Sequence, residues 1–189
     1  IMYKKCVMLG CLCAWHVLFA FALNSHDFKS GQKIPAKYAC HKYGLNLTPH
    51  LHWTHPPKQT RSYVLFVEDL DARYAKQPQA RIDPQWVVFI PRKRHTLPHD
   101  LMHNPSVFKQ VLMTQNLKGH YDYQGPCATD DRMHRYLFTV FALNQSLNRL
   151  QKKGLNASMD RDKVLQLISR HIVGTAQMTA LFRHSQKKS

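Results

Sequence analysis

The chain has 189 residues, which is enough for one ordinary domain with a short appendage but not for several domains. Hydrophobic residues make up 44% and charged residues 20%, so the chain can bury a core and is not of the disordered class. Lysine and arginine number 27 against 11 acids, and the formal net charge of +16 suits phosphate, anionic lipid or nucleic acid rather than a cationic partner.

The N-terminal residues have the layout of a secretory signal peptide. Lys4 and Lys5 precede an apolar run that closes with Ala20-Phe21-Ala22, an A-x-A pattern typical of a cleavage site. The run is shorter than the roughly 20 residues that a membrane-spanning helix needs. We therefore expect residues 1–22 to be cleaved and the protein to be periplasmic or secreted; an uncleaved N-terminal membrane anchor is the alternative.

Removal of this segment would leave a single domain over residues 23–184 and a basic tail at 185–189. The domain would keep two cysteines, Cys40 and Cys127. An even count in an exported protein indicates one disulfide, although the sequence does not show that the two positions meet. Two buried free thiols are the alternative.

Strand signals dominate the middle of the chain. Three segments are β-branched and aromatic and are bounded by turn-rich stretches: 62–67, 86–90 and 136–143. A helical pattern follows, with Ser158 or Asp160 as its cap and apolar residues at helical spacing from Val164 to Ala176. This order predicts one mostly β domain of the sandwich type with a late helix.

Three of the few acids lie within four residues: Glu68, Asp69 and Asp71. On a strand, alternation would place Asp69 and Asp71 on one face and Glu68 on the other. Ion pairing at a strand end is the simpler interpretation in a chain so rich in arginine. The functional interpretation is a binding site that accepts hydrogen bonds.

The segment His134-Arg135-Tyr136 offers a second group of polar side chains. Alternation places His134 and Tyr136 on one face, where both can donate hydrogen bonds to an anion such as phosphate. Arg135 would then pair with a carboxylate, for example Asp71. The alternative is that His134 is a buried core histidine beside an aromatic ring.

Other polar patterns predict less. His50 and His52 share a face of an extended stretch, but nothing in the sequence makes three or four ligands converge, so we expect no metal site. The basic run at 92–95 favours a solvated loop over peripheral contact with an anionic membrane. No nucleophile motif and no aromatic-basic module is present, so we expect neither an enzyme, nor a cofactor, nor a nucleic-acid partner.

Five short motifs occur in the order found in the phosphatidylethanolamine-binding protein family, in its bacterial Raf-kinase-inhibitor-like branch. The resemblance runs from about Phe28 to Phe182. Its segments are 46–53 (NLTPHLHW, similar to N-x-S-P-x-L-x-W), 68–72 (EDLDA, similar to D-P-D-A-P), 85–91 (QWVVFIP), 125–127 with 134–136 (GPC and HRY), and 141–143 (FAL).

The resemblance implies an antiparallel β-sandwich with Greek-key-like connections, a C-terminal helix and short peripheral helices. It also implies a small pocket that binds phosphate or a phospholipid headgroup. On this chain, the family's pocket-lining positions are Asp69, Gln85, His134 and Tyr136, with Gly125 and Pro126 at the rim.

The chain departs from the family pattern at this pocket. Gln85 stands where the family has histidine, so one group loses its capacity to carry charge, and Leu70 and Arg73 replace two prolines. We expect an exported, non-enzymatic module that binds a phosphate-like anion. The alternative is a protein-interaction module that inhibits a protease or kinase-like partner through its surface, with a degenerate pocket. The sequence does not indicate the oligomeric state.

Overall fold

The computed structural model of the chain describes residues 20–74, 77–116 and 118–184. The predicted basic tail and residues 1–19 of the predicted signal peptide lie outside these ranges. Among the described residues, no helix has both the length and the apolar character needed to cross a membrane.

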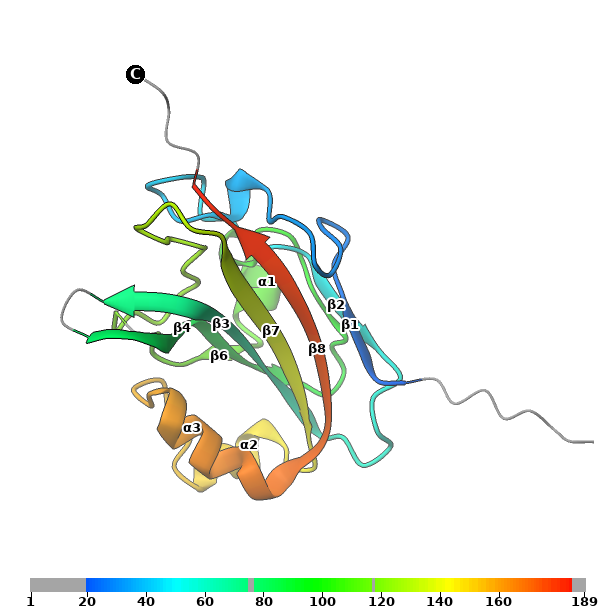
Figure 1. Ribbon diagram of the computed structural model, residues 1–189. Coiled ribbons are helices and arrows are strands. Elements are labelled where there is room, and N and C mark those ends of the chain that lie inside the picture. Colours follow the sequence, from blue (N-terminus) through cyan, green and yellow to red (C-terminus); the bar gives the residue numbers. More distant parts are fainter. Residues whose placement is uncertain (1–19, 75–76, 117, 185–189) are drawn as a thin grey trace, which may run out of the picture.

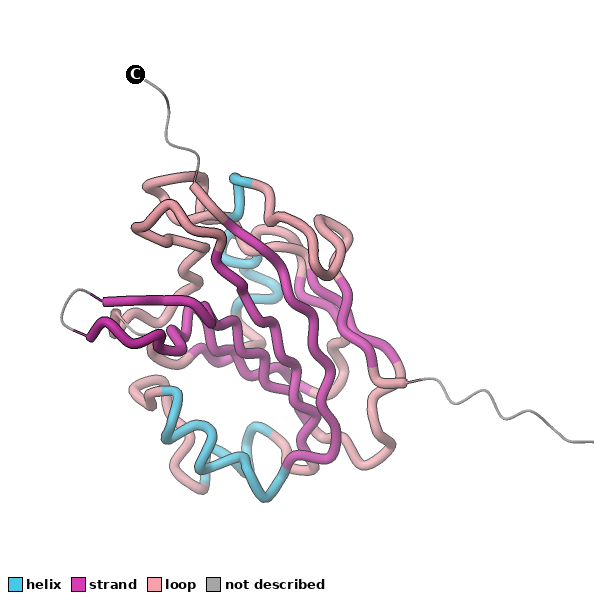
Figure 2. Tube along the Cα trace, viewed as in Figure 1, coloured by secondary structure: helices cyan, strands magenta, loops and turns pink. Residues whose placement is uncertain are grey.

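Two antiparallel sheets form the body of the molecule, which confirms the predicted mainly β fold (Figures 1 and 2). The smaller sheet has the order β1-β2-β5, with β1 (Ala22–Asn24), β2 (Leu51–Thr54) and β5 (Thr96–Leu97). The larger sheet has the order β6-β4-β3-β7-β8, with β6 (Leu112–Met113), β4 (Gln77–Pro91), β3 (Ser62–Tyr74), β7 (His134–Leu143) and β8 (Ile172–Phe182).

Short helices lie between the strands. The α-helices are α1 (Pro105–Phe108), α2 (Leu147–Lys152) and α3 (Arg161–Ile168). Single 3-10 turns form η1 (Ala36–Tyr38), η2 (Leu101–His103) and η3 (Ser169–His171). The three predicted strand segments all lie within longer strands of the large sheet, namely β3, β4 and β7.

The large sheet is buried on both faces, which explains its almost continuous apolar runs. One face of β3 contributes Tyr63 and Leu65 to a core shared with the small sheet. The other face contributes Val64 and Phe66 to a second core, which also contains Leu150 of α2 and Val164 of α3. Both helices lie on this side of the large sheet (Figure 1). Alternate side chains of one strand therefore enter two different cores.

The predicted late helix is shorter than the apolar spacing suggested. Asp160 caps α3 by accepting a hydrogen bond from the Lys163 amide at 2.9 Å, and α3 ends at Ile168. The predicted helical positions as far as Ala176 include part of β8, where Ala176 pairs with Val140 of β7. Gly174 and its β-branched neighbours disfavour a helix, and the free side of β7 offers a complete set of strand hydrogen bonds.

The segment after β1 covers one end of β8. The Gly31 amide donates to the Thr179 carbonyl at 2.6 Å, and the Ile34 amide donates to the Leu181 carbonyl at 2.7 Å. In return the Leu181 amide donates to the Gln32 carbonyl at 2.9 Å. The last residues of the outermost strand of the large sheet are thus already paired.

The predicted cleavage position falls at the first residue of β1. Ala22 pairs with Thr54 of β2, and the ring of Phe21 lies 6.5 Å from that of Tyr63. The ordered body of the protein therefore includes residues on both sides of that position.

Candidate functional site

The centre of the predicted site is His134, whose two ring nitrogens each face a carboxylate. Nδ1 lies 2.8 Å from Asp69 Oδ2 and 3.0 Å from Asp69 Oδ1. Nε2 lies 3.0 Å from Asp130 Oδ1. His134 and Asp69 are only 2% and 3% exposed, whereas the side chain of Asp130 is 37% exposed. We call these three residues the His134 site.

These contacts favour the charged imidazolium. The hydrogen bond to Asp69 raises the pKa of His134 above its ordinary value, against the opposing effect of burial, and Asp130 raises it further. A neutral ring has only one N–H, so the ring can donate to both carboxylates only when it is protonated. The site therefore holds a buried cation between two anions.

Asp130 closes the site on its solvent side. It also accepts a hydrogen bond from Arg132 Nη2 at 2.7 Å. Although burial acts to raise the pKa of Asp130, the hydrogen bonds from Arg132 and His134 outweigh it and lower the pKa to about 2. The sequence analysis missed Asp130 because it lies in a turn, where no periodicity places its side chain. Its position four residues before His134 was the only signal.

All three clustered acids have basic partners. Glu68 forms an ion pair with Arg161, Asp69 with His134, and Asp71 with Arg135 at 2.7 Å. The hydrogen bond from Arg135 lowers the pKa of Asp71 to about 2. The ion-pairing interpretation thus describes all three contacts.

The predicted placement of Asp69 and Asp71 on one face is wrong. Asp69 contacts His134, which is buried on one face of β7, while Asp71 contacts Arg135, which is exposed on the other. A register shift between Asp69 and Ala72 explains the difference, because an irregularity in a strand breaks the alternation of its side chains.

Tyr136 and Gln85, the other predicted lining residues, are also buried. Tyr136 is opposite Asp69 in the pairing of β3 with β7. Gln85 lies on β4, the strand on the other side of β3, and is 4% exposed. Within the described residues its Oε1 has no hydrogen-bond partner, so the strand next to Asp69 carries an unpaired buried acceptor.

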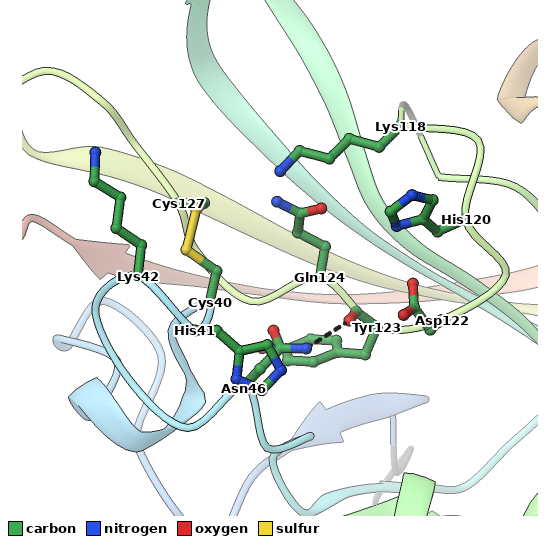
Figure 3. A pocket seen from close by; sticks show the side chains of 10 residues that line it. All are labelled: Cys40, His41, Lys42, Asn46, Lys118, His120, Asp122, Tyr123, Gln124 and Cys127. Atoms are coloured by element: carbon green, nitrogen blue, oxygen red, sulfur yellow. Dashed lines mark hydrogen bonds between the residues drawn. A yellow bond between two sulfur atoms is a disulfide. The ribbon is translucent and has the colours of Figure 1, made fainter.

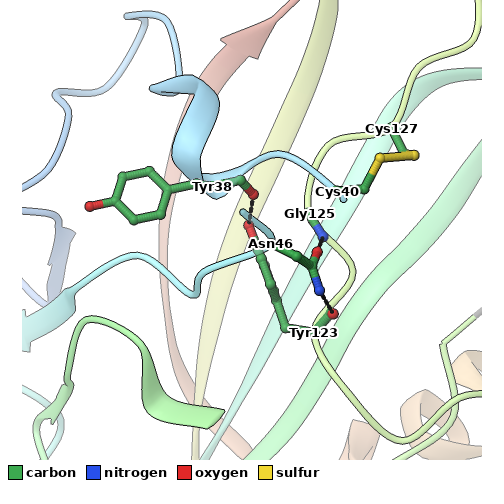
Figure 4. Close-up of a disulfide and its surroundings, with 6 residues drawn as sticks. All are labelled: Tyr38, Cys40, Asn46, Tyr123, Gly125 and Cys127. Atoms are coloured by element: carbon green, nitrogen blue, oxygen red, sulfur yellow. Dashed lines mark hydrogen bonds between the residues drawn. A yellow bond between two sulfur atoms is a disulfide. The ribbon is translucent and has the colours of Figure 1, made fainter. Parts of the chain in front are cut away.

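The predicted rim, Gly125 and Pro126, precedes Cys127 of a disulfide that joins two loops. Figure 4 shows Gly125 beside this bond. Cys40 and Cys127 are bonded, with their Cα atoms 5.4 Å apart. The Cys40 amide donates to the Pro126 carbonyl at 3.1 Å. A Cβ on Gly125 would lie 2.1 Å from the Tyr38 carbonyl oxygen, so only glycine fits this close approach.

Asn46 ties the same two loops together. Its Oδ1 accepts a hydrogen bond from the Gly125 amide at 2.8 Å, and its Nδ2 donates to the Tyr123 carbonyl at 3.0 Å (Figure 4). The Tyr123 hydroxyl in turn donates to the Tyr38 carbonyl at 3.0 Å. The asparagine of the first family-like motif thus fixes the backbone next to the predicted rim.

An open pocket of about 390 Å³ lies at this loop junction (Figure 3). None of the four predicted lining residues borders it. Its lining comes from Cys40, His41, Lys42, Asn46, Lys118, His120, Asp122, Tyr123, Gln124 and Cys127. The pocket is adjacent to the predicted site, because the Gln124 amide donates to the Gln85 carbonyl at 3.1 Å. Lys42 and Lys118 of the lining lie on separate loops. The predicted bond between Cys40 and Cys127 was the one sequence signal that these loops meet.

A second group of histidines lies apart from these residues. His26, His50 and His52 each offer a ring nitrogen, and the three atoms lie within 4.8 Å of one another. We call these residues the histidine cluster. The sequence analysis found no convergence of metal-binding residues because His26 is far from the other two along the chain. The pairing of β1 with β2 brings them together.

Comparison with known proteins identifies the family. The sequence profile of phosphatidylethanolamine-binding proteins matches residues 24–183. The chain belongs to the phosphatidylethanolamine-binding protein family. This membership confirms the resemblance found in the sequence motifs, and it supports a binding module in general without naming the ligand.

Relatives and solved structures agree with this assignment. A UPF0098 protein of Aquifex aeolicus is 31% identical over 93% of this chain and 99% of its own length. A UPF0098 protein of Chlamydia trachomatis is 29% identical over 85% of this chain and 97% of its own length. The crystal structure of Escherichia coli YbcL has a TM-score of 0.75 at 23% identity, covering 88% of this chain and all of that chain, and supports the fold.

Proposed function

We propose that this member of the family is a non-enzymatic binding module that holds a small anionic group, phosphoryl or carboxyl, at His134. The observation that carries the proposal is the contact between His134 Nε2 and Asp130 Oδ1 at 3.0 Å. The Nε2–H of the charged ring already points at a carboxylate, so a bound anion would accept the same charge-assisted hydrogen bond in the place of Asp130. Asp69 would keep the ring protonated and oriented from the other side.

The incoming anion would take the place of the Asp130 carboxylate. Asp130 is the most exposed member of the His134 site and lies in a turn, so it is the group that can move aside. Arg132, which now pairs with Asp130, would then be left to pair with the ligand. Asp130 therefore acts as an internal competitor that lowers the affinity for anions.

The pocket at the loop junction supports the proposal by providing space next to Gln85, one of the predicted lining residues. Its lining has two lysines, Lys42 and Lys118, against one acid, Asp122, and the net positive charge attracts anions. The unpaired Oε1 of the buried Gln85 could accept a hydrogen bond from an ammonium or hydroxyl group of a larger ligand. A headgroup that carries both a phosphate and an amine would satisfy both kinds of group.

The test is a titration with inorganic phosphate and with phosphoethanolamine, followed by NMR of the His134 ring. We expect the His134 resonance to shift in the wild type at millimolar ligand. In Asp130→Asn we expect affinity to increase roughly ten- to hundredfold, because a charge-assisted hydrogen bond worth about 1.5–3 kcal/mol no longer competes. Tighter binding of phosphoethanolamine than of phosphate would indicate a lipid-headgroup ligand over the free ion.

The double variant Lys42→Ala/Lys118→Ala separates the two neighbouring regions. Loss of phosphate binding in this variant, together with an unmoved His134 resonance in the wild type, would place the anion in the loop pocket and overturn the proposal. Unchanged affinity in Asp130→Asn would also contradict it, because the competitor would then have no effect.

The alternative function is a protein-interaction module that inhibits a protease or kinase-like partner. One observation favours it: both nitrogens of His134 already have carboxylate partners, so the site is satisfied without a ligand. In that case a partner identified by cross-linking in the exported proteome would bind His134→Gln as well as the wild type. If His134→Gln loses partner binding and phosphate binding to the same extent, the result would favour anion binding at His134 over a surface interaction.

We also propose that the protein acts after export. The N-terminal pattern supports this, as does the disulfide, since such bonds persist mainly in oxidising compartments. Arg92 and Lys93, exposed after β4, would favour peripheral contact with an anionic membrane. Mass spectrometry of the mature N-terminus tests the cleavage, and vesicles with and without phosphatidylserine test the membrane contact.

A further inference from the structure

The histidine cluster is assembled by the small sheet on a face that does not enter the core. Leu51 and Trp53 of β2 are buried, so alternation directs His50 and His52 to the opposite side. His26 follows β1 on the neighbouring strand and is exposed. Ring centroids of His26 lie 4.1 Å from His50 and 4.7 Å from His52, so the three side chains are in contact.

Hydrogen bonds between the side chains of Ser25 and Asp27 and the His50 backbone hold His26 against His50. The Ser25 hydroxyl donates to the His50 carbonyl at 2.7 Å, and Asp27 Oδ2 accepts from the His50 amide at 2.6 Å. The residues on both sides of His26 are therefore tied to the backbone of His50. This arrangement preorganises two of the three rings without using any of their nitrogens.

A hydroxyl group fixes the tautomer of His50. Thr96 Oγ1 donates to the Leu51 carbonyl at 3.0 Å and lies 3.1 Å from His50 Nε2. Because the hydroxyl has only one hydrogen, it accepts from Nε2–H, which leaves the lone pair on His50 Nδ1. A partner of this kind, bonded to the second ring nitrogen, is the usual support of a metal-binding histidine.

Two ring nitrogens of the cluster have no hydrogen-bond partner among the described residues. Nδ1 of His50 and Nδ1 of His52 are shielded from solvent and make no hydrogen bond to the described residues. Burial lowers the pKa of both rings, and the neighbouring His26 lowers them further. Buried nitrogens without a partner are costly in a folded protein unless a ligand satisfies them.

From this geometry we propose that His26, His50 and His52 bind one divalent transition-metal ion, of the Zn²⁺ or Cu²⁺ class. Imidazole nitrogen is a preferred ligand of these ions, whereas Ca²⁺ and Mg²⁺ require oxygen. Three protein nitrogens leave a fourth position for water or an external ligand. Metal–nitrogen bonds of about 2.0–2.1 Å require the rings to close from their present spacing, which the exposed His26 permits by rotating.

The test uses tag-free protein that has been stripped with EDTA. Zn²⁺ is titrated by calorimetry, and Co²⁺ by visible absorbance, which reports the ligand set directly. We expect one equivalent in the wild type, with binding weakened roughly tenfold or more by His26→Ala or His50→Ala. Thr96→Val removes no ligand and is expected to weaken binding less, through loss of the fixed tautomer.

The matched control is His103→Ala, which removes an exposed histidine elsewhere and should leave the titration unchanged. Circular dichroism of each variant confirms that the fold is retained. The proposal is overturned if His26→Ala/His50→Ala/His52→Ala binds Zn²⁺ as tightly as the wild type. It is also overturned if the wild type takes up no stoichiometric metal, or if His103→Ala abolishes binding.

Discussion

The His134 site and the histidine cluster use the same side chain in opposite ways. His134 lies between two carboxylates, which raise its pKa and favour the cation. His50 and His52 lie against another imidazole and are partly buried, which lowers their pKa values and favours the neutral ring. The neighbours of a histidine thus decide whether it presents a charged donor or a lone pair. The first suits an anion and the second a metal ion.

The largest effect we expect tests whether the two regions belong to one cooperative unit. The Cys40–Cys127 bond closes a loop with a sequence separation of 87, which contains Asp69 and His50 but neither His134 nor His26. Cys40→Ser/Cys127→Ser should lower the free energy of unfolding by about 4 kcal/mol on the chain-entropy account. Chemical denaturation followed at both regions should show one transition. Two separate transitions would show that the regions unfold independently.

Removal of His134 should cost nearly as much. In His134→Ala the Asp69 carboxylate stays buried without its partner, and such an unpaired charge costs about 3–5 kcal/mol. His52→Ala removes a ring on an outer face and should cost less than about 1 kcal/mol. Urea unfolding of the two variants measures this contrast. Adding Asp69→Asn to His134→Ala should recover part of the lost stability. If the double variant is less stable than His134→Ala, the buried charge is not the cause of the loss.

The two regions should also give opposite pH dependence of stability. The folded-state pKa of His134 is raised, so its contribution is fully present below the ordinary value of 6.5 and is lost as pH rises through the raised pKa. The pKa values of His50 and His52 are lowered, so their region loses stability as pH falls below 6.5. The free energy of unfolding of metal-free protein, measured against pH in the wild type, His134→Gln and His50→Gln, gives the pH slope that each histidine contributes. Equal slopes for the two histidines would refute the contrast.

An exposed pair next to the buried site provides a smaller effect. In Arg135→Gln the pKa of Asp71 should rise from about 2 toward its ordinary value of 3.8, because the hydrogen bond from Arg135 is the main cause of the shift. Global stability at neutral pH should fall, because the lowered pKa of Asp71 is linked to folding, but solvent screening at the exposed Arg135 should keep the loss smaller than that of His134→Ala. Carboxyl NMR measures the pKa. A large loss of stability would mean that Asp71 supports the His134 site.

The smallest effect concerns charge within the histidine cluster. His26→Ala removes one neighbouring imidazole, so the pKa values of His50 and His52 should rise slightly, with burial still holding them below normal. Ring-proton NMR at several pH values measures this shift. Stability should change by no more than about 0.5 kcal/mol, as for most surface substitutions. A fall in either pKa would contradict the inference that the His26 ring repels a proton on His50 and His52.

The parts of the fold that the sequence predicted are those with strong local patterns. Segments 62–67, 86–90 and 136–143 were predicted as strands because buried strands combine β-branched and aromatic residues. The helix beyond Ile168 was wrong because apolar spacing is ambiguous in a short segment, and the pairing of Ala176 with Val140 of β7 decided its structure. Tertiary hydrogen bonding overrode the local pattern.

The candidate site could be predicted where its residues lie on regular strands, because side chains there alternate between the two faces. The prediction that Arg135 could pair with Asp71 followed from alternation on β7, whereas the departure of Asp71 from the face of Asp69 required a register shift that the sequence does not indicate. Asp130 and His26 could not be placed, because a turn and a strand pairing position them. Periodicity predicts faces of regular elements and not the contacts that loops make.

The pairing of residues 31–34 with the end of β8 has a consequence for self-association. A long outermost strand is a template on which another copy can add its own strand. Here the Thr179 and Leu181 carbonyls already accept hydrogen bonds from the Gly31 and Ile34 amides. The segment thus blocks edge-to-edge growth at that end, and it is the early part of the chain that keeps its last strand from recruiting a neighbour.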